Sequence, residues 1–249
     1  MNPNANILSS LIQQQNNHNS KSTFLPLYLG EIDYAQALKK QELLFQARIR
    51  GQSQDILLLL QHPHVFTVGR FRGESDFTAD SKTIAEKGIP IFHTNRGGSI
   101  TYHGPGQLIG YPIIDLKKAR LSVREYICNL EEVVLLSLHN IGIRGRRLPN
   151  LRGVWIDERK VCSIGINITN HITTHGFALN VNTDLSYFKM IDPCGLPHVM
   201  MTSIAKTLGT SAPMDTVIDN VVHYFSAVFE MQIDREGKEC LSVCESQSG

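Results

Sequence analysis

The stretch Asn95–Gln107 reads N-R-G-G-S-I-T-Y-H-G-P-G-Q and predicts the architecture at the centre of this chain. It holds four glycines, and apolar runs flank it at 89–92 and 108–114. Glycine allows turns with positive φ and lets a backbone approach a ligand closely, because no Cβ intervenes. We therefore expect two strands joined through glycine turns by a short strand, Ser99–His103.

Two polar side chains in this stretch, Arg96 and His103, are chemically informative. An arginine presents a fixed fork of donors, and a neutral histidine both donates and accepts a hydrogen bond. The glycines alone fit a double hairpin with a surface arginine. The combination of an arginine, paired glycines and a histidine favours a binding site.

The composition is that of an ordinary globular protein: the chain has 249 residues, of which 42% are hydrophobic and 19% are charged. This length suits one large domain or two small ones, and no linker or internal repeat divides the chain. A net charge of +1 provides no global field for nucleic acid, and no apolar run reaches the length of a membrane-spanning helix. We expect neither nucleic acid nor a membrane as a partner.

The cysteines and the two ends of the chain complete this outline. Five cysteines without the paired spacing of a zinc site indicate a reduced, cytoplasmic protein with no bound metal. Residues 1–22 are rich in Asn, Gln and Ser, which predicts a disordered lead-in. The polar residues 231–249 are expected to form a loose tail, so that a single catalytic domain spans 23–230.

Hydrophobic periodicity and capping residues predict three long helices. They span Tyr34 to about Arg50 after an Asp33 cap, Ser122–His139 with a Ser122–Glu125 capping box, and Asp215–Phe229. The other expected strands are Phe24–Leu29, Asp55–Leu60, Val65–Arg70, Gly153–Ile156, Lys160–Ile166 and Thr173–Val181. His62 and His64 flank a proline and are interpreted as turn residues. Arg144, Arg146 and Arg147 form a predicted basic loop, either solvated or docked to an acidic partner.

Cys194 differs from the other cysteines because it lies in a Pro-Cys-Gly loop, where a thiol can be exposed. Cys128 and Cys162 fall within predicted elements and are interpreted as core residues. A reactive thiol must ionise, and a nearby ammonium group favours the thiolate. Lys160, at the start of a predicted strand, is a candidate for this role, although its spacing alone fits a solvated charge equally well.

Several motifs together resemble those of one enzyme family, the lipoyl(octanoyl) transferases. The segment 96–107, R-G-G-S-I-T-Y-H-G-P-G-Q, resembles the family signature. Further matches are Gly153-Val154-Trp155 with Lys160 and Ser163-Ile164-Gly165, the segment 175–180, Pro193-Cys194-Gly195 with Thr202-Ser203, and an early block at 62–70. These motifs follow one another in order over roughly 25–208, and several motifs in register are far more specific than any one of them.

The resemblance implies a fold of the α/β (α+β) class: a single domain with a mixed β-sheet and flanking helices, similar to the catalytic domains of biotin and lipoate protein ligases. It implies that Cys194 is the acyl-carrying nucleophile and that Lys160 lowers the pKa of its thiol. The implied acyl-substrate site consists of Arg96, Gly97, Gly98, Ser99, Ile100, Thr101, Tyr102, His103, Ser163, Ile164, Gly165, Gly176, Phe177 and Ala178. Cys162 is a departure, because a small residue such as alanine is expected there.

The implied reaction moves octanoyl from the phosphopantetheine arm of acyl carrier protein, through a thioester on Cys194, to a lysine of a lipoyl domain. The implied acceptors are the lipoyl domains of 2-oxoacid dehydrogenases and the glycine cleavage H protein. Conversion of a thioester to an amide is downhill, so the transfer needs neither ATP nor a bound cofactor. Covalent catalysis divides it into two similar steps.

Three alternatives remain open at the level of sequence. An ATP-dependent lipoate protein ligase shares the fold and a lysine, but Pro193-Cys194-Gly195 argues against it. An amidotransferase would take its acyl group from a protein amide rather than from a thioester. A non-enzymatic module that only recognises lipoyl domains would form no covalent acyl adduct.

Overall fold

The computed structural model describes residues 22–71, 77–79, 84, 86–192 and 199–234. Within these residues the chain forms an eight-stranded and a three-stranded sheet. The strands are β1 (Thr23–Glu31), β2 (Asp55–Gln61), β3 (Val65–Val68), β4 (Ile91–His93), β5 (Ile100–His103), β6 (Gln107–Ile113), β7 (Arg146–Leu148), β8 (Leu151–Ile156), β9 (Arg159–Thr169), β10 (Ile172–Asn180) and β11 (Gln232–Ile233). The helices are α2 (Tyr34–Ile49), α4 (Val123–Asn140), α5 (Ile204–Leu208), α6 (Met214–Phe229) and the 3₁₀ helix η2 (Leu185–Met190).

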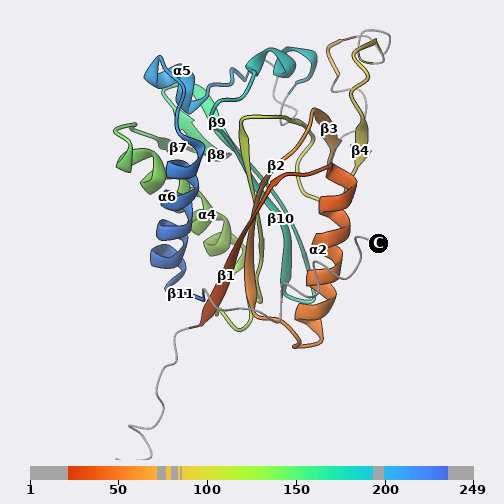
Figure 1. The fold of residues 1–249 in the computed structure, drawn as a ribbon, viewed down its shortest axis with the longest axis vertical. Helices are drawn as coiled ribbons and strands as arrows, with labels where there is room; N and C mark the ends of the chain where they lie inside the picture. The colour runs from red at the N-terminus through yellow and green to blue at the C-terminus, as the bar shows by residue number, and fades with distance from the viewer. Residues whose placement is uncertain (1–21, 72–76, 80–83, 85, 193–198, 235–249) are drawn as a thin grey trace, which may run out of the picture.

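The large sheet is mixed, with the order β11-β1-β2-β6-β10-β9-β8-β7. β1 runs parallel to both β11 and β2, whereas every pairing from β2 to β7 is antiparallel. The small sheet has the order β4-β3-β5, and β3 is parallel to β4 but antiparallel to β5. Helix α2 covers one face of the large sheet, and α4 and α6 cover the other (Figure 1). The expected single α/β domain with a mixed sheet and flanking helices is confirmed.

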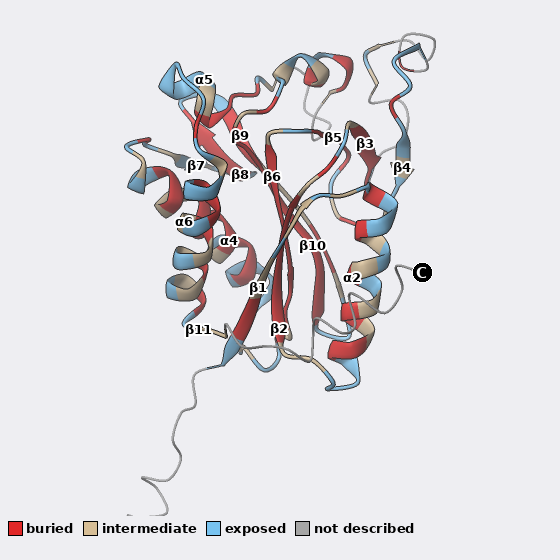
Figure 2. Cartoon of the chain, in the orientation of Figure 1, coloured by how far each residue is buried: buried red, intermediate tan, exposed pale blue. Residues whose placement is uncertain are grey.

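The sequence of strand β2 shows why the large sheet lies between two layers of helices. Its residues Ile56 to Leu60 form one unbroken apolar run, and all five are buried (Figure 2). Successive side chains of a strand point to opposite faces, so a strand covered on both sides is apolar throughout. Leu57 and Leu59 accordingly join the core under α4 and α6, whereas Leu58 and Leu60 join the core under α2.

The predicted caps define the two helices that flank the site. The Asp33 side chain accepts hydrogen bonds from the backbone N–H groups of Ala35 (2.8 Å) and Gln36 (3.3 Å), which fixes the start of α2. Ser122 and Glu125 form the predicted capping box of α4. Among the described residues, no helix is long and apolar enough to cross a membrane. The cytoplasmic location and the disordered lead-in stay predictions.

The structure corrects three sequence-based expectations. The loose tail does not begin at residue 231, because Gln232–Ile233 pairs with β1 as β11. The predicted basic loop contains strand β7, and Arg147 in that strand bonds to Glu131 and Glu132. Cys128 is exposed rather than part of the core. Strands this short give no periodic pattern, and a single cysteine on a helix indicates its face only weakly.

Candidate active site

A pocket lies where the α2 face of the large sheet meets the glycine turn and the small sheet. Its lining comes from the start of α2, the turn at 96–99 and strands β5, β6, β9 and β10, and consists of Tyr34, Arg96, Gly97, Gly98, Ser99, Ile100, Thr101, His103, Tyr111, Ser163, Ile164, Gly165, His175, Gly176, Phe177 and Ala178. Every residue assigned to the acyl site by the family resemblance lines this pocket, except Tyr102. Segments far apart in the sequence therefore meet where the motifs predict.

The glycine turn at 96–99 packs closely against the end of β3 and against β9. The Gly97 N–H donates a hydrogen bond to Ile166 O (2.8 Å), in the part of β9 that lies beyond its pairing with β8. Gly98 has a φ of +90°, a conformation that other residues rarely adopt. A Cβ added to Gly69 would lie 2.4 Å from Gly98 O, and one added to Gly165 would lie 3.0 Å from Gly97 O. The glycines thus allow three backbone segments to approach one another around the pocket.

Arg96 is buried, with 7% of its surface exposed, and its guanidinium points into the protein. Its Nε and Nη2 donate to Thr67 Oγ1 at 3.2 and 2.9 Å, and Nη1 donates to Gly97 O at 3.1 Å. Nη2 also donates to the carbonyl of Thr67. The alternative of a surface arginine is therefore wrong, and Arg96 fastens the glycine turn to β3 while it lines the pocket.

His103 is held in one tautomer. Its Nδ1 lies 2.8 Å from Gln107 Oε1, while Gln107 Nε2 donates to Tyr102 O and Asn180 Oδ1. The amide oxygen of Gln107 can only accept, so Nδ1 carries the proton and Nε2 is left as an acceptor. Burial, above all, lowers the pKa of His103 well below its usual value, so its imidazole is neutral at neutral pH.

Sequence reasoning missed three pocket residues: Tyr34, Tyr111 and His175. His175 has a φ of +55°, and its Nε2 lies 2.7 Å from Asn95 Oδ1. Because a left-handed φ departs from regular strand geometry, alternation along β10 gives no guide to the direction of this side chain. Burial and the positive charges of Arg96 and Arg70 lower the pKa of His175 to about 4. Tyr34 and Tyr111 carry no distinctive sequence signal, because each also suits a helix or strand core.

Tyr102 packs away from the pocket. Its hydroxyl lies 2.7 Å from His64 Nδ1, and its ring stacks on Tyr187 of η2 with centroids 4.8 Å apart. Neighbouring Thr101 and His103 line the pocket, and alternation along β5 directs Tyr102 to the opposite side. Tyr102 therefore joins the small sheet to η2 and is not part of the pocket wall, contrary to its predicted role.

Lys160 lies in a second pocket of about 310 Å³, which shares Gly97, Gly98, Ile164 and Gly165 with the first. The lysine is only 4% exposed, and its Nζ lies 5.5 Å from the centroid of the Trp155 ring. Its backbone N–H donates to Met200 O (2.8 Å), and the Thr202 N–H donates to Lys160 O (2.9 Å). The chain that follows residue 199 therefore runs beside Lys160.

Gly153 gives Lys160 its space. It has a φ of +108°, and an added Cβ would lie 2.3 Å from Cys162 O and 2.7 Å from Lys160 Cε. The Gly153 N–H donates to Glu131 Oε1 of α4 at 2.9 Å. The glycine of the Gly153-Val154-Trp155 motif is thus explained by the close approach of the Lys160 side chain.

The cysteines near the site differ in what the structure describes. Cys194 lies outside the described residues, so its predicted role as nucleophile stays a prediction. Cys162 is fully buried, and this burial raises the pKa of its thiol to about 12, although the Lys160 charge acts in the opposite direction. A thiol with so high a pKa is almost wholly protonated at neutral pH and is a poor nucleophile.

Comparison with known sequences identifies the family to which this chain belongs. The sequence profile of the lipoyl protein ligase A/B catalytic domain matches residues 33–226, and the chain belongs to that family. It is 46% identical over 205 residues to an octanoyltransferase of Solibacter usitatus, covering 82% of this chain and 92% of that protein. An octanoyltransferase of Koribacter versatilis is 41% identical, with 83% and 84% covered. Relatives this similar show that the chain is a transferase of the octanoyltransferase group.

Solved structures with little sequence identity share the fold. A lipoate-protein ligase A bound with ATP gives a TM-score of 0.67 at 16% identity, covering 91% of this chain and 93% of that one. The biotin protein ligase of Aquifex aeolicus in complex with biotin and ATP gives 0.53 at 16% identity, covering 83% and 70%. The expected similarity to lipoate and biotin ligase catalytic domains is confirmed at the level of fold.

Proposed function

We propose that this transferase moves an octanoyl group from acyl carrier protein to a lysine of a lipoyl domain, through a thioester on Cys194. The observation that carries the proposal is the pair of adjoining pockets. One is lined by the predicted acyl-site residues, and the other contains the buried Lys160. The octanoyl chain occupies the first pocket, and the reacting carbonyl lies near the second.

The position of Lys160 supports its pairing with Cys194. Met201 forms a parallel bridge with Lys160, and Cys194 precedes Met201 by seven positions in the sequence. Ile191 and Val199, described residues on either side of Cys194, both line one cavity together with Met201. The proposed pairing is therefore supported by a contact of Lys160 with a residue that follows Cys194 closely in the chain.

The reaction has two balanced steps. The Cys194 thiolate attacks the thioester carbonyl, the C–S bond to phosphopantetheine breaks, and the departing thiolate takes a proton from the Lys160 ammonium. The amine of the acceptor lysine then attacks the acyl-enzyme and gives a proton back to Lys160. An amide C–N bond forms, and the Cys194 thiolate leaves. The reaction consumes no ATP, and the acyl group arrives on the carrier, so the proposal includes no bound cofactor.

The proposed acceptors are the lipoyl domains of 2-oxoacid dehydrogenases and the glycine cleavage H protein. Each offers a lysine amine, which must enter the Lys160 pocket to reach the acyl group. Arg152 and Asn150 are exposed where they line this pocket, so it is open to an incoming chain.

Intact and peptide mass spectrometry tests the nucleophile. After mixing with octanoyl carrier protein and no ATP, the parent and Cys162→Ala should each carry one octanoyl group on Cys194. Cys194→Ser should carry none, because a serine hydroxyl is far less acidic than a thiol. An adduct on Cys162, or octanoyl transfer that requires ATP and free octanoate, contradicts the proposal. The second outcome identifies an ATP-dependent ligase.

A further inference from the structure

The first pocket has an end that is remote from Lys160. Lys160 lines only the second pocket, and Tyr34 and His103 line only the first. The two pockets meet at four shared residues of the glycine turn and β9, including Gly97 and Gly165. A chain attached near Lys160 therefore passes Gly97 and Gly165 before it reaches Tyr34 and His103.

Tyr34 is held rigidly at this end. It is the first residue of α2, directly after the Asp33 cap, and it is 2% exposed. Its ring stacks on that of His103, with centroids 6.1 Å apart and an interplanar angle of 10°. The rings of His62 and Phe92 lie 5.1 Å away. A ring packed against three others has little freedom to move aside.

The rings around Tyr34 are also fixed and uncharged. His62 Nδ1 donates to Ile32 O (2.7 Å), and its Nε2 accepts from the Tyr111 hydroxyl (2.9 Å). Burial lowers the pKa of His62 to about 4 and raises that of Tyr34 to about 12, so both are neutral at neutral pH. A wall of neutral rings suits the methyl end of an alkyl chain.

We infer that the Tyr34 ring, stacked on His103, ends the acyl site and limits the length of the transferred chain. The inference rests on the proposed octanoyl transfer and adds the residue that selects its substrate. An acyl chain longer than the pocket meets a packed aromatic wall rather than solvent. Replacing the ring with a methyl group leaves a cavity that further methylenes can fill.

The experiment compares octanoyl, decanoyl and dodecanoyl carrier proteins in competition, since selectivity is the ratio of kcat/KM values. Each buried methylene strengthens binding about fourfold. Decanoyl has two more methylenes than octanoyl, so Tyr34→Ala should raise the decanoyl-to-octanoyl ratio about fifteenfold. Tyr34→Phe keeps the ring and should keep the parental ratio. Tyr28→Ala removes a half-exposed tyrosine of β1 that does not line the pocket. As a control, it should keep the parental ratio.

The outcomes separate this inference from the function on which it rests. Tyr34→Leu is a second variant that fills more of the space than Ala, in case Tyr34→Ala does not fold. A folded Tyr34→Ala or Tyr34→Leu protein with the parental ratio overturns the role of Tyr34, even where the parent forms its Cys194 adduct. If the parent protein forms no adduct with any carrier, the proposed function itself is contradicted, whatever the Tyr34 variants do.

Discussion

A side chain at position 153 would overlap the side chain of Lys160. The Cβ of Gly153→Ala would lie 2.7 Å from Lys160 Cε and 2.3 Å from a backbone carbonyl, at a φ of +108°. The lysine must therefore move, and in the proposed mechanism a misplaced proton-transfer group costs about 10²-fold in rate. We expect Gly153→Ala to form acyl-enzyme at least about 10²-fold more slowly, measured by rapid-quench mass spectrometry.

Gly142→Ala is the matched control. Gly142 also has a positive φ, +79°, but an added Cβ would meet no atom within 4 Å. This variant should lose about 1 kcal/mol of stability through backbone strain and keep the parental rate of acylation. Equal rates in the parent and a folded Gly153→Ala protein would show that the position of Lys160 does not matter for acylation.

At the scale of residues, sequence predicts what the glycine motifs contain and misses what packs against them. Arg96, the pair Gly97–Gly98 and His103 lie close together in the chain, and all of them line the pocket. Tyr34 and Tyr111 reach the pocket through the packing of α2 and β6, which no local pattern encodes. The error at Tyr102 has a simple cause, because a motif includes both faces of a strand and only one face lines the pocket.

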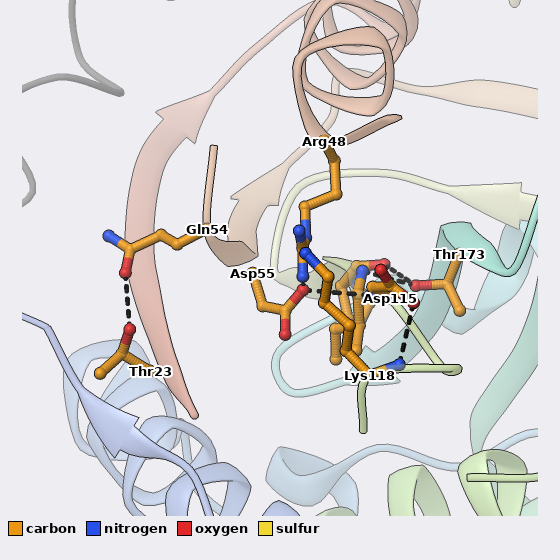
Figure 3. A network of polar contacts seen from close by, with 9 residues as sticks. Thr23, Arg48, Gln54, Asp55, Asp115, Lys118 and Thr173 are labelled. Atoms are coloured by element: carbon orange, nitrogen blue, oxygen red, sulfur yellow. Dashed lines mark hydrogen bonds and ion pairs between the residues drawn. The ribbon is translucent and has the colours of Figure 1, made fainter. Parts of the chain in front are cut away.

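Helix α2 is fixed at both ends. Tyr34 begins it at the pocket, and near its other end Arg48 Nε donates to Asp55 Oδ1 at 2.7 Å. The same carboxylate oxygen accepts from the Asp115 N–H (3.0 Å), so one buried group joins α2, β2 and the end of β6 (Figure 3). This network holds the helix that carries Tyr34 against the sheet.

Removing one partner of this ion pair should be costly. Both side chains are about 5% exposed, and Arg48→Met would leave the Asp55 carboxylate buried without its cation. We expect a loss of about 3–5 kcal/mol in the free energy of unfolding at neutral pH, measured by urea denaturation. Arg50→Met, at the exposed end of the same helix, should change it by less than about 0.5 kcal/mol.

The loss of stability caused by Arg48→Met should depend on pH in a definite direction. Burial raises the pKa of Asp55, while Arg48 opposes that shift, so the variant should have a still higher pKa. A carboxyl group whose folded pKa is raised binds protons more tightly in the folded state, so stability falls as pH rises through this range. The difference in free energy of unfolding between the parent and Arg48→Met should therefore shrink as pH falls from 7 towards 5. A difference that is constant or grows would show that Asp55 is not the cause.

At the scale of elements, sequence predicts the long helices and the buried strands well, because caps and periodicity are local signals. The capping box of α4 and the Asp33 cap of α2 are both confirmed. The short elements β7, β11 and η2 are not predicted. β11 depends on a partner distant in the chain, since Gln232–Ile233 pairs with β1, whereas β7 and η2 are too short to give a periodic pattern.

At the scale of the molecule, two cores on opposite faces of one sheet position the site. The core under α4 and α6 supports Cys162 and Ile164, and the core under α2 supports Tyr111 and Ala178. The two pockets adjoin where the glycine turn meets the edge of β9. Sequence motifs predict this meeting in general terms, but the register that places Gly97 beside Ile166 is visible only in the structure.

The charge of the whole molecule leads to a last prediction. A net charge of +1 gives little long-range attraction, so the proposed acyl carrier protein would have to be recognised locally. The phosphopantetheine arm has a negatively charged phosphodiester, and exposed Arg152 lines the Lys160 pocket. An exposed ion pair contributes up to about 1 kcal/mol, so Arg152→Gln should raise KM for octanoyl carrier protein about two- to fivefold with kcat unchanged.

Salt and a matched variant make this prediction specific. Added salt screens exposed charges, so the KM of the parent should rise towards that of Arg152→Gln as ionic strength increases. Lys117→Gln removes an exposed cation that follows the far end of β6, where Ile113 pairs with Ile56, and should leave KM and its salt dependence unchanged. Equal effects of the two substitutions would indicate that net charge, rather than the position of Arg152, governs the encounter. A kcat effect confined to Arg152→Gln would instead place that side chain in the chemical step.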